Sequence, residues 1–302
     1  MAFFRGLSAF PITPTDADGR VDTHALDRIL ERLVKAGVDS IGLLGSTGIY
    51  AYLHRAERRR AVEAAADRVG GRLPLMVGVG ALRTDEAEDL ARDAKAAGAD
   101  ALLLAPVSYT PLTEEEVYQH FAAIAGAVDL PLCIYNNPGT THFAFSPELL
   151  TRLAALDSIQ AVKMPLPAET DVATELGHLR AKLPEEFAVG YSGDWGCAEA
   201  LLAGADAWYS VIGGLLPGPA LQLTRAAQAG NAEEARRIDG RMQPLWALFR
   251  EFGSLRVVYA AANRLGLSNA VPPRPILPIS GAELGRVAAA LEAIGALEQA
   301  RA

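Results

Sequence analysis

The 302-residue chain is acidic, with a formal net charge of −8 and a sequence pI near 5.2, and half of its residues are hydrophobic. This charge argues against nucleic acid or an anionic membrane as the main partner, because both are negatively charged. No apolar run reaches the roughly 18 residues of a membrane span, and the first residues lack a signal-peptide pattern. We therefore expect a soluble, cytoplasmic protein.

Eight short apolar runs predict β-strands along the first two thirds of the chain. The runs are nearly continuous in apolar residues, which is typical of parallel strands covered on both faces. In chain order they span residues 6–9, 40–44, 75–79, 101–104, 132–135, 159–163, 188–191 and 207–210.

The segments between these runs carry helix start and stop signals. Asp22 can cap a helix that stops at Gly37, residues 113–116 form a capping box, and Ser146 precedes a proline at a first helical position. Strands that alternate with crossover helices predict a (β/α)8 TIM barrel. The competing open doubly wound sheet would need a glycine-rich turn after the first strand, where this chain reads FPITP.

The domain organisation follows from where the strand pattern stops. We expect a barrel over residues 1–216 that carries the active site, and a C-terminal helical region over residues 217–302 packed on it. No linker or low-complexity segment marks an independent second domain.

Two reactive side chains end neighbouring predicted strands, Tyr135 the fifth and Lys163 the sixth. Catalytic side chains of barrels lie at this end of the strands. Burial favours the neutral form of an amine, which is the form that attacks carbonyls, and a nearby phenol can move protons. The pair indicates Schiff-base chemistry. The alternatives are a lysine extended to solvent and a rim tyrosine that packs only.

Loops after other predicted strands add candidates. Ser46 and Thr47 lie between two glycines, in a turn that suits a carboxylate or phosphate or is merely a tight turn. Tyr109 follows the fourth strand, where packing or an interface is the alternative role. The segment Ser192-Gly193-Asp194 follows the seventh strand and can donate backbone hydrogen bonds to either anion.

Other titratable residues give weaker signals. Cys133 shares the strand face of Tyr135 and is expected in the core, and the two cysteines form no disulfide or zinc pattern. The histidines show no metal-ligand spacing, so no metal site is predicted from them. The arginine run 58–60 is expected on a solvated helix face or at a subunit contact.

Together these motifs resemble the dihydrodipicolinate synthase/N-acetylneuraminate lyase superfamily of class I pyruvate-dependent aldolases. The GSTG loop, Tyr109, the YNxP segment from Tyr135, Lys163 and the SGD loop occur in that order, one per barrel loop. The resemblance runs from about Gly6 into the helical tail and so covers nearly the whole chain.

The resemblance implies a role for each motif. Lys163 would form an imine with pyruvate or with the pyruvyl part of a longer 2-oxo acid, and Tyr135 would shuttle protons over it. Thr47 would link Tyr135 to Tyr109, which would reach in from a neighbouring subunit. The hydroxyls of Ser46 and Thr47 would also hold the substrate carboxylate.

The remaining implications concern the imine pocket and the assembly. Backbone near Gly193 and Tyr209 would line the imine. The family is typically a homotetramer, a dimer of dimers, that binds a small 2-oxo acid and uses no cofactor.

The chain departs from the pattern where the second substrate would bind. In dihydrodipicolinate synthases an arginine in the loop after the fifth strand binds the aldehyde's carboxylate. That position is Thr140 here, which cannot form a bidentate ion pair but stays a candidate for substrate binding. Ile49 and Met164 stand where acidic residues are common, and Tyr50 follows Ile49, so a less charged, more aromatic pocket is expected.

These observations lead to one main functional prediction and three alternatives. We expect a Schiff-base lyase or aldolase acting on pyruvate or on a 2-oxo acid such as a 2-keto-3-deoxy sugar acid. The alternatives are 4-hydroxy-tetrahydrodipicolinate synthase, a 2-keto-3-deoxy acid dehydratase, and a non-catalytic barrel that binds a 2-oxo acid. Retention of the lysine, both tyrosines and the hydroxyl pair speaks against the last.

Overall fold

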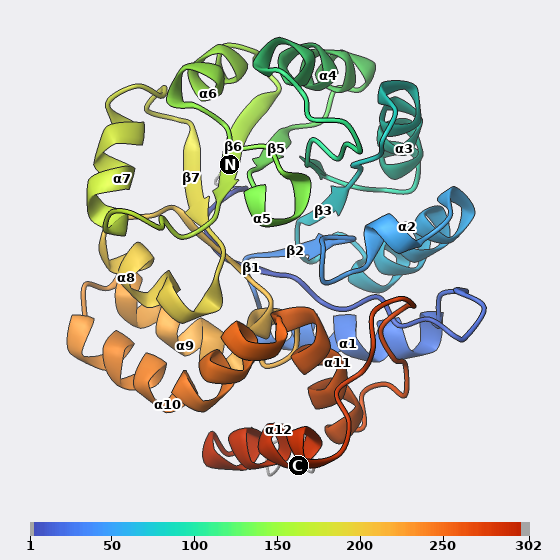
Figure 1. Ribbon diagram of the computed structural model, residues 1–302, viewed down its shortest axis with the longest axis vertical. Helices are drawn as coiled ribbons and strands as arrows, with labels where there is room; N and C mark the ends of the chain where they lie inside the picture. The colour runs from blue at the N-terminus through green and yellow to red at the C-terminus, as the bar shows by residue number, and fades with distance from the viewer. Residues whose placement is uncertain (1–2, 297–302) are drawn as a thin grey trace.

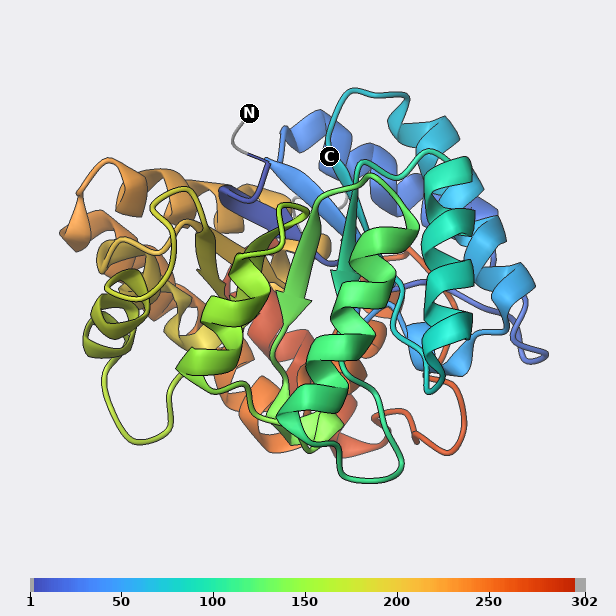
Figure 2. The same ribbon diagram turned by 90° about the horizontal axis from the view of Figure 1, so that it is seen from above.

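The computed structural model describes residues 3–296 and shows a closed barrel of eight parallel strands, with β8 paired to β1 (Figure 1). This confirms the TIM barrel and rules out the open sheet. The strands are β1 (Gly6–Ala9), β2 (Ser40–Leu43), β3 (Leu75–Gly78), β4 (Ala101–Leu104), β5 (Leu132–Tyr135), β6 (Ile159–Met164), β7 (Ala188–Tyr191) and β8 (Ala207–Ser210). The side view shows the strand arrows pointing to one end of the barrel, inside a layer of helices (Figure 2).

Each strand lies within one residue of its predicted bounds. The second strand ends before Leu44 because that residue has a positive φ of 55°, which turns the chain out of the extended conformation. The turn leads directly into the GSTG loop, so the strand end sets where the loop hydroxyls lie.

The α-helices surround the barrel and extend beyond it. They are α1 (Thr23–Ala36), α2 (Arg55–Val69), α3 (Thr84–Ala96), α4 (Glu114–Ala127), α5 (Pro138–Thr141), α6 (Pro147–Ala154), α7 (Val172–Arg180), α8 (Cys197–Leu202), α9 (Pro217–Gln228), α10 (Ala232–Phe252), α11 (Ser254–Arg264) and α12 (Ala282–Ala293). The predicted caps form: Asp22 accepts from Ala25, and Thr113 and Glu116 make a capping box. None of the helices within residues 3–296 is long and apolar enough to cross a membrane.

The barrel interior is filled by a few large side chains above small ones. Phe10, Met76, Leu103 and Tyr209 pack there with alanines from the other strands. Cys133 belongs to the same cluster as Tyr135, which confirms the shared strand face. The packed interior closes the barrel beneath the strand ends, so the cavity that residues at and after the strand ends form lies at their carboxyl side.

The C-terminal helices continue the outer layer and then cover one side of the barrel mouth. The last crossover helix, α9, packs against β1 and α1, so it belongs with the helices around the barrel. The next three, α10 to α12, pack on one another, and Figure 1 shows them together at one side of the barrel, with α11 close to α1. The predicted boundary at residue 217 falls at the first residue of α9.

One surface expectation is wrong for a single residue. Arg58 is only 8% exposed, whereas its neighbours Arg59 and Arg60 are exposed. Its guanidinium donates to the carbonyls of Leu53 and Gly80 and lies over the ring of Tyr50 at 5.2 Å. The run therefore spans two faces of α2, and Arg58 supports a tyrosine in the segment after β2, at the carboxyl end of the barrel.

Candidate active site

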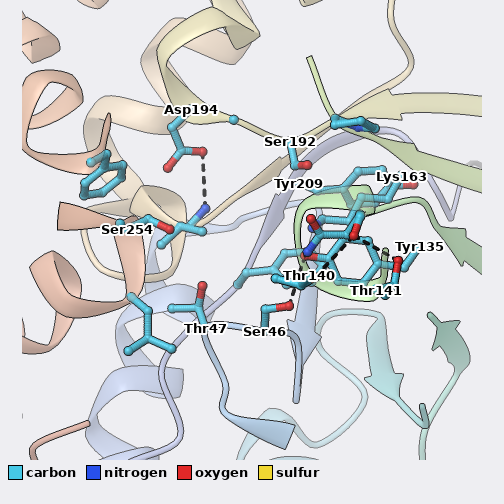
Figure 3. A pocket seen from close by; sticks show the side chains of 18 of the residues that line it. Ser46, Thr47, Tyr135, Thr140, Thr141, Lys163, Ser192, Asp194, Tyr209 and Ser254 are labelled. Atoms are coloured by element: carbon cyan, nitrogen blue, oxygen red, sulfur yellow. Dashed lines mark hydrogen bonds between the residues drawn. The ribbon is translucent and has the colours of Figure 1, made fainter. Parts of the chain in front are cut away.

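One cavity of about 780 Å³ opens at the carboxyl ends of the strands. It collects residues from the segments after seven of the strands, all except β3, and from the C-terminal helices (Figure 3). The sequence-predicted site residues that line it are Ser46, Thr47, Tyr135, Thr140, Lys163, Gly193 and Tyr209. Of the predicted site residues, Tyr109 alone does not line it: its side chain is 96% exposed.

Lys163 lies at the buried end of this cavity. It is 5% exposed, and its Nζ is 3.6 Å from the ring centroid of Tyr135 and 5.1 Å from that of Phe10. No carboxylate of residues 3–296 forms an ion pair with it. Parallel pairing of β5 with β6 sets Lys163 directly opposite Tyr135, so the register of this one strand pair produces the contact.

The phenol of Tyr135 is held by two polar side chains. Its Oη lies 3.2 Å from Ser46 Oγ, and Asn137 Nδ2 donates to it at 3.0 Å. Burial raises the pKa of Tyr135, but the neighbouring Lys163 amine and the hydrogen bonds outweigh burial and leave that pKa below its usual value. A phenol adjusted in this way is better suited to give and take protons near neutral pH.

The hydroxyl that contacts Tyr135 differs from the expected one. Ser46 makes the hydrogen bond, while Thr47 lines the cavity without bonding to Tyr135 within the described chain. Because the left-handed residues Leu44 and Ile49 flank the loop, its turn directs the first hydroxyl toward the phenol. Within one chain, no described contact connects Thr47 to Tyr109.

Asn137 is a site residue that the motif analysis did not single out. It sits two residues after Tyr135, at the N-cap of the short helix α5, and its amide turns back to the phenol. The only sequence signal was its place in the YNxP segment. An amide at a helix start is common, so that signal did not distinguish it from a structural cap.

Among residues 3–296, Asp194 is the only acidic residue that lines the cavity. Its carboxylate already accepts hydrogen bonds from other residues of the protein. It is 3% exposed and accepts hydrogen bonds from Trp208 Nε1 at 2.8 Å and from the backbone of Ile212 at 2.7 Å and Val211 at 3.3 Å. Burial raises the pKa of Asp194 to about 6. These bonds tie the loop after β7 to the loop after β8, and thereby position Gly193.

The cavity walls are aromatic, as expected. Ile49 and Met164 are buried in the core and do not line the cavity. Its aromatic walls include Tyr50, which directly follows Ile49, together with Tyr52, Trp195 and Phe249. Thr140 is exposed, and its hydroxyl donates to the carbonyl of Asn137.

The family model described as "Dihydrodipicolinate synthetase family" matches residues 3–294, nearly the entire chain. The protein belongs to the dihydrodipicolinate synthetase family. Among curated members, the 4-hydroxy-tetrahydrodipicolinate synthase of Alcanivorax borkumensis is 35% identical over 296 residues, which is 97% of this chain and 99% of that protein. That of Teredinibacter turnerae is 32% identical and covers 97% and 100% of the two chains.

Solved structures of the family superpose closely. A dihydrodipicolinate synthase from Agrobacterium tumefaciens is 68% identical, with a TM-score of 0.96 over 97% of this chain and 98% of that one. A chloride-inhibited dihydrodipicolinate synthase from Acinetobacter baumannii, complexed with pyruvate, is 29% identical, with a TM-score of 0.89 over 97% and 99%. The family's fold therefore covers nearly all of this chain.

Proposed function

We propose that this protein is a class I lyase that forms an imine between Lys163 and the 2-oxo group of pyruvate, or of the pyruvyl part of a longer acid. The observation that carries the proposal is the buried Lys163 amine, 3.6 Å from the ring centroid of Tyr135 within an open cavity. Membership in a family whose relatives include a structure complexed with pyruvate supports it.

The residues in reach suffice for each step of imine formation. The Lys163 nitrogen attacks the C2 carbonyl and gives a carbinolamine, which loses its hydroxyl as water to leave an iminium ion. Tyr135 gives the proton that the leaving hydroxyl needs and takes a proton back afterwards. Loss of a proton from C3 of the iminium then gives an enamine, the carbon nucleophile that forms or breaks the C–C bond.

The hydroxyl-rich loop supplies a site for the carboxylate next to that carbonyl. Ser46 and Thr47 line the cavity beside Tyr135, and their turn offers backbone N–H groups. Gly193 and Tyr209 line the wall around the lysine. This arrangement holds the 2-oxo acid by its carboxylate and leaves its C3 open to the cavity.

The names of the relatives bear on the overall reaction. They favour 4-hydroxy-tetrahydrodipicolinate synthase, with pyruvate and aspartate semialdehyde as substrates, over the sugar-acid aldolase that the sequence placed first. We therefore propose the synthase reaction as the first to test. The exposed Thr140 favours a second candidate, an aldolase acting on a longer 2-oxo acid, because it offers no charge to the aldehyde's carboxylate.

Borohydride reduction in the presence of pyruvate tests the imine directly. A stable pyruvate adduct on Lys163, found by peptide mass mapping, is expected for the wild type and Lys182→Ala, and none for Lys163→Ala. Lys182 is the matched control because it is exposed and paired with Glu148. Absence of a wild-type adduct, or an adduct that persists in Lys163→Ala, would refute the proposal. Product analysis with aspartate semialdehyde and with 2-keto-3-deoxy acids then separates synthase, aldolase and dehydratase.

We further propose that the protein acts as a homotetramer in which Tyr109 of one subunit completes a neighbouring site. Its 96% exposed ring within one chain supports this, since a partner subunit can cover it. Sedimentation together with Tyr109→Phe turnover tests it. We expect the variant to remain a tetramer and to have reduced turnover. Full turnover in the variant would mean that Tyr109 does not take part in proton transfer through Thr47 and Tyr135.

A further inference from the structure

The cavity extends well beyond the space that pyruvate needs. Its volume of about 780 Å³ falls in the range of sites that enclose much larger molecules. Figure 3 shows Lys163, Tyr135 and Thr140 together on one side and Ser254 on the opposite side. The far wall is formed by Phe249, Gly253, Ser254, Leu255, Arg256 and Ile276, all from the C-terminal helical region.

Arg256 is the charged residue of that far wall. Its guanidinium donates one hydrogen bond, from Nη1 to the carbonyl of Phe252 at 3.2 Å, and it lies beside Gly253. No carboxylate within residues 3–296 forms an ion pair with it, which is also true of Arg250, whereas Arg286 pairs with Glu251. A guanidinium has five N–H donors, so most of those of Arg256 have no hydrogen-bond partner within residues 3–296. The side chain lines both this cavity and a neighbouring pocket next to Tyr259.

The charge pattern of the cavity leaves this cation open to a ligand. In the part of the chain that the structure describes, Lys163 and Arg256 are the only lysine or arginine residues lining it, and Asp194 is the only acidic one. Asp194 already accepts three hydrogen bonds from the protein, so it does not compete for Arg256. Arg256 also lies in the first turn of α11, where the helix dipole favours anions.

We propose that Arg256 binds a carboxylate on the part of the substrate that lies away from the imine. The proposal rests on imine formation at Lys163 and narrows the substrate class to 2-oxo acids, or pyruvate adducts, whose tail ends in a second carboxylate. Thr140, on the lysine side, offers no charge for that group. The distal anion is therefore recognised from the C-terminal helices and not from the loop after β5.

Matched pairs of 2-oxo acids test this assignment. The dianionic acids 2-oxoglutarate, 2-oxoadipate and 2-oxopimelate are each compared with the neutral-tailed acid of equal length, by competition with pyruvate for borohydride trapping on Lys163. We expect at least one dianionic acid to bind about 5-fold more tightly than its partner, the size of effect typical of an exposed charge pair. Equal binding within all three pairs would overturn the proposal.

Variants assign the preference to one residue. Arg256→Gln should abolish the preference for dianionic acids. Arg256→Lys should keep part of it, because lysine keeps the positive charge but lacks the bidentate hydrogen-bonding geometry of the guanidinium. Arg250→Gln is the control, since Arg250 is exposed near the same helix junction but does not line the cavity. A preference that survives in Arg256→Gln, or disappears equally in Arg250→Gln, would contradict the assignment.

Pyruvate trapping separates this proposal from the proposed function. If wild type and Arg256→Gln trap pyruvate on Lys163 equally while all three pairs bind alike, only the Arg256 assignment fails. If the wild type traps no pyruvate, the imine proposal itself fails.

Discussion

The two walls of the cavity are built in different ways. The wall around Lys163 and Tyr135 comes from the ends of paired strands, is buried, and is cross-linked by hydrogen bonds. The far wall comes from helices added after the barrel, is partly exposed, and carries a cation that no acidic residue of the described chain pairs. Strand registers hold reacting groups in place, whereas a helix on the rim can change its side chains without disturbing the barrel.

Lys163→Ala is the substitution on the lysine-side wall that should lower activity most. Removing the imine nitrogen should lower turnover by about 10⁴-fold or more, because no other lysine among residues 3–296 lines the cavity. Steady-state rates measure this, with Lys182→Ala as the control and thermal unfolding as a check on folding. Near-normal turnover in Lys163→Ala would mean that the chemistry does not pass through this amine.

Tyr135→Phe tests the same wall with the lysine left in place. The variant should keep a detectable pyruvate adduct but lose about 10²-fold or more in turnover, since it lacks the acid–base group. Adduct yield and rate are measured on the same sample. Unchanged turnover would refute the shuttle role.

Asp194→Asn tests the link between the loops after β7 and β8. An amide cannot accept hydrogen bonds on both atoms, so the variant should lose about 1–3 kcal/mol of stability. Urea unfolding at pH 7 measures this loss of stability. Because asparagine has nearly the same size and shape as aspartate, the substitution leaves the packing in place. A loss smaller than about 0.5 kcal/mol, on the order of ordinary surface changes, would contradict the positioning role.

The pH dependence of Asp194 has a defined sign. Its pKa is raised from 3.8 to about 6 in the folded state, so the folded state holds the proton more tightly than the unfolded chain. Its contribution to stability is therefore greatest below pH ~4, falls as the pH rises to about 6, and is constant above that. The stability difference between wild type and Asp194→Asn should shrink across this window, and a difference that grows would show a lowered pKa.

Asn137→Ala tests whether the hydrogen bond from Asn137 to Tyr135 sets the pKa of the phenol. Loss of the 3.0 Å hydrogen bond should raise the pKa of Tyr135, because one donor to its oxygen is gone. We expect about 10-fold lower turnover and a Tyr135-dependent limb of the pH–rate profile moved to higher pH. Thr140→Ala, in the same loop, should leave that profile in place.

Thr140→Arg adds a positive charge to the lysine-side wall of the cavity. An arginine at this exposed position should raise kcat/KM for a carboxylate-bearing aldehyde by about 5-fold, a smaller change than the loss of a buried reacting group causes. In that background Arg256→Gln should matter less than it does alone. If Thr140→Arg has no effect while Arg256→Gln does, the distal carboxylate is held only by the far wall.

Short-range patterns were sufficient for most of the barrel and for the centre of its site. Buried parallel strands are continuous apolar runs, so each predicted strand lies within one residue of the observed one. Tyr135 and Lys163 end consecutive strands, and adjacent parallel strands bring such ends together. Within the arginine run the pattern failed at Arg58, because three neighbouring arginines look alike until the helix rotation points one inward.

The remaining features depend on packing between distant segments. Which hydroxyl of the GSTG loop faces Tyr135 follows from left-handed residues on both sides of that loop, and the use of Asp194 follows from β7 lying beside β8. Arg256 lies 93 residues after Lys163 (256 − 163), and no local pattern connects the two. They share a cavity because α10 and α11 pack over the barrel mouth, and such a contact is set by how apolar helix faces fit together and not by spacing along the chain.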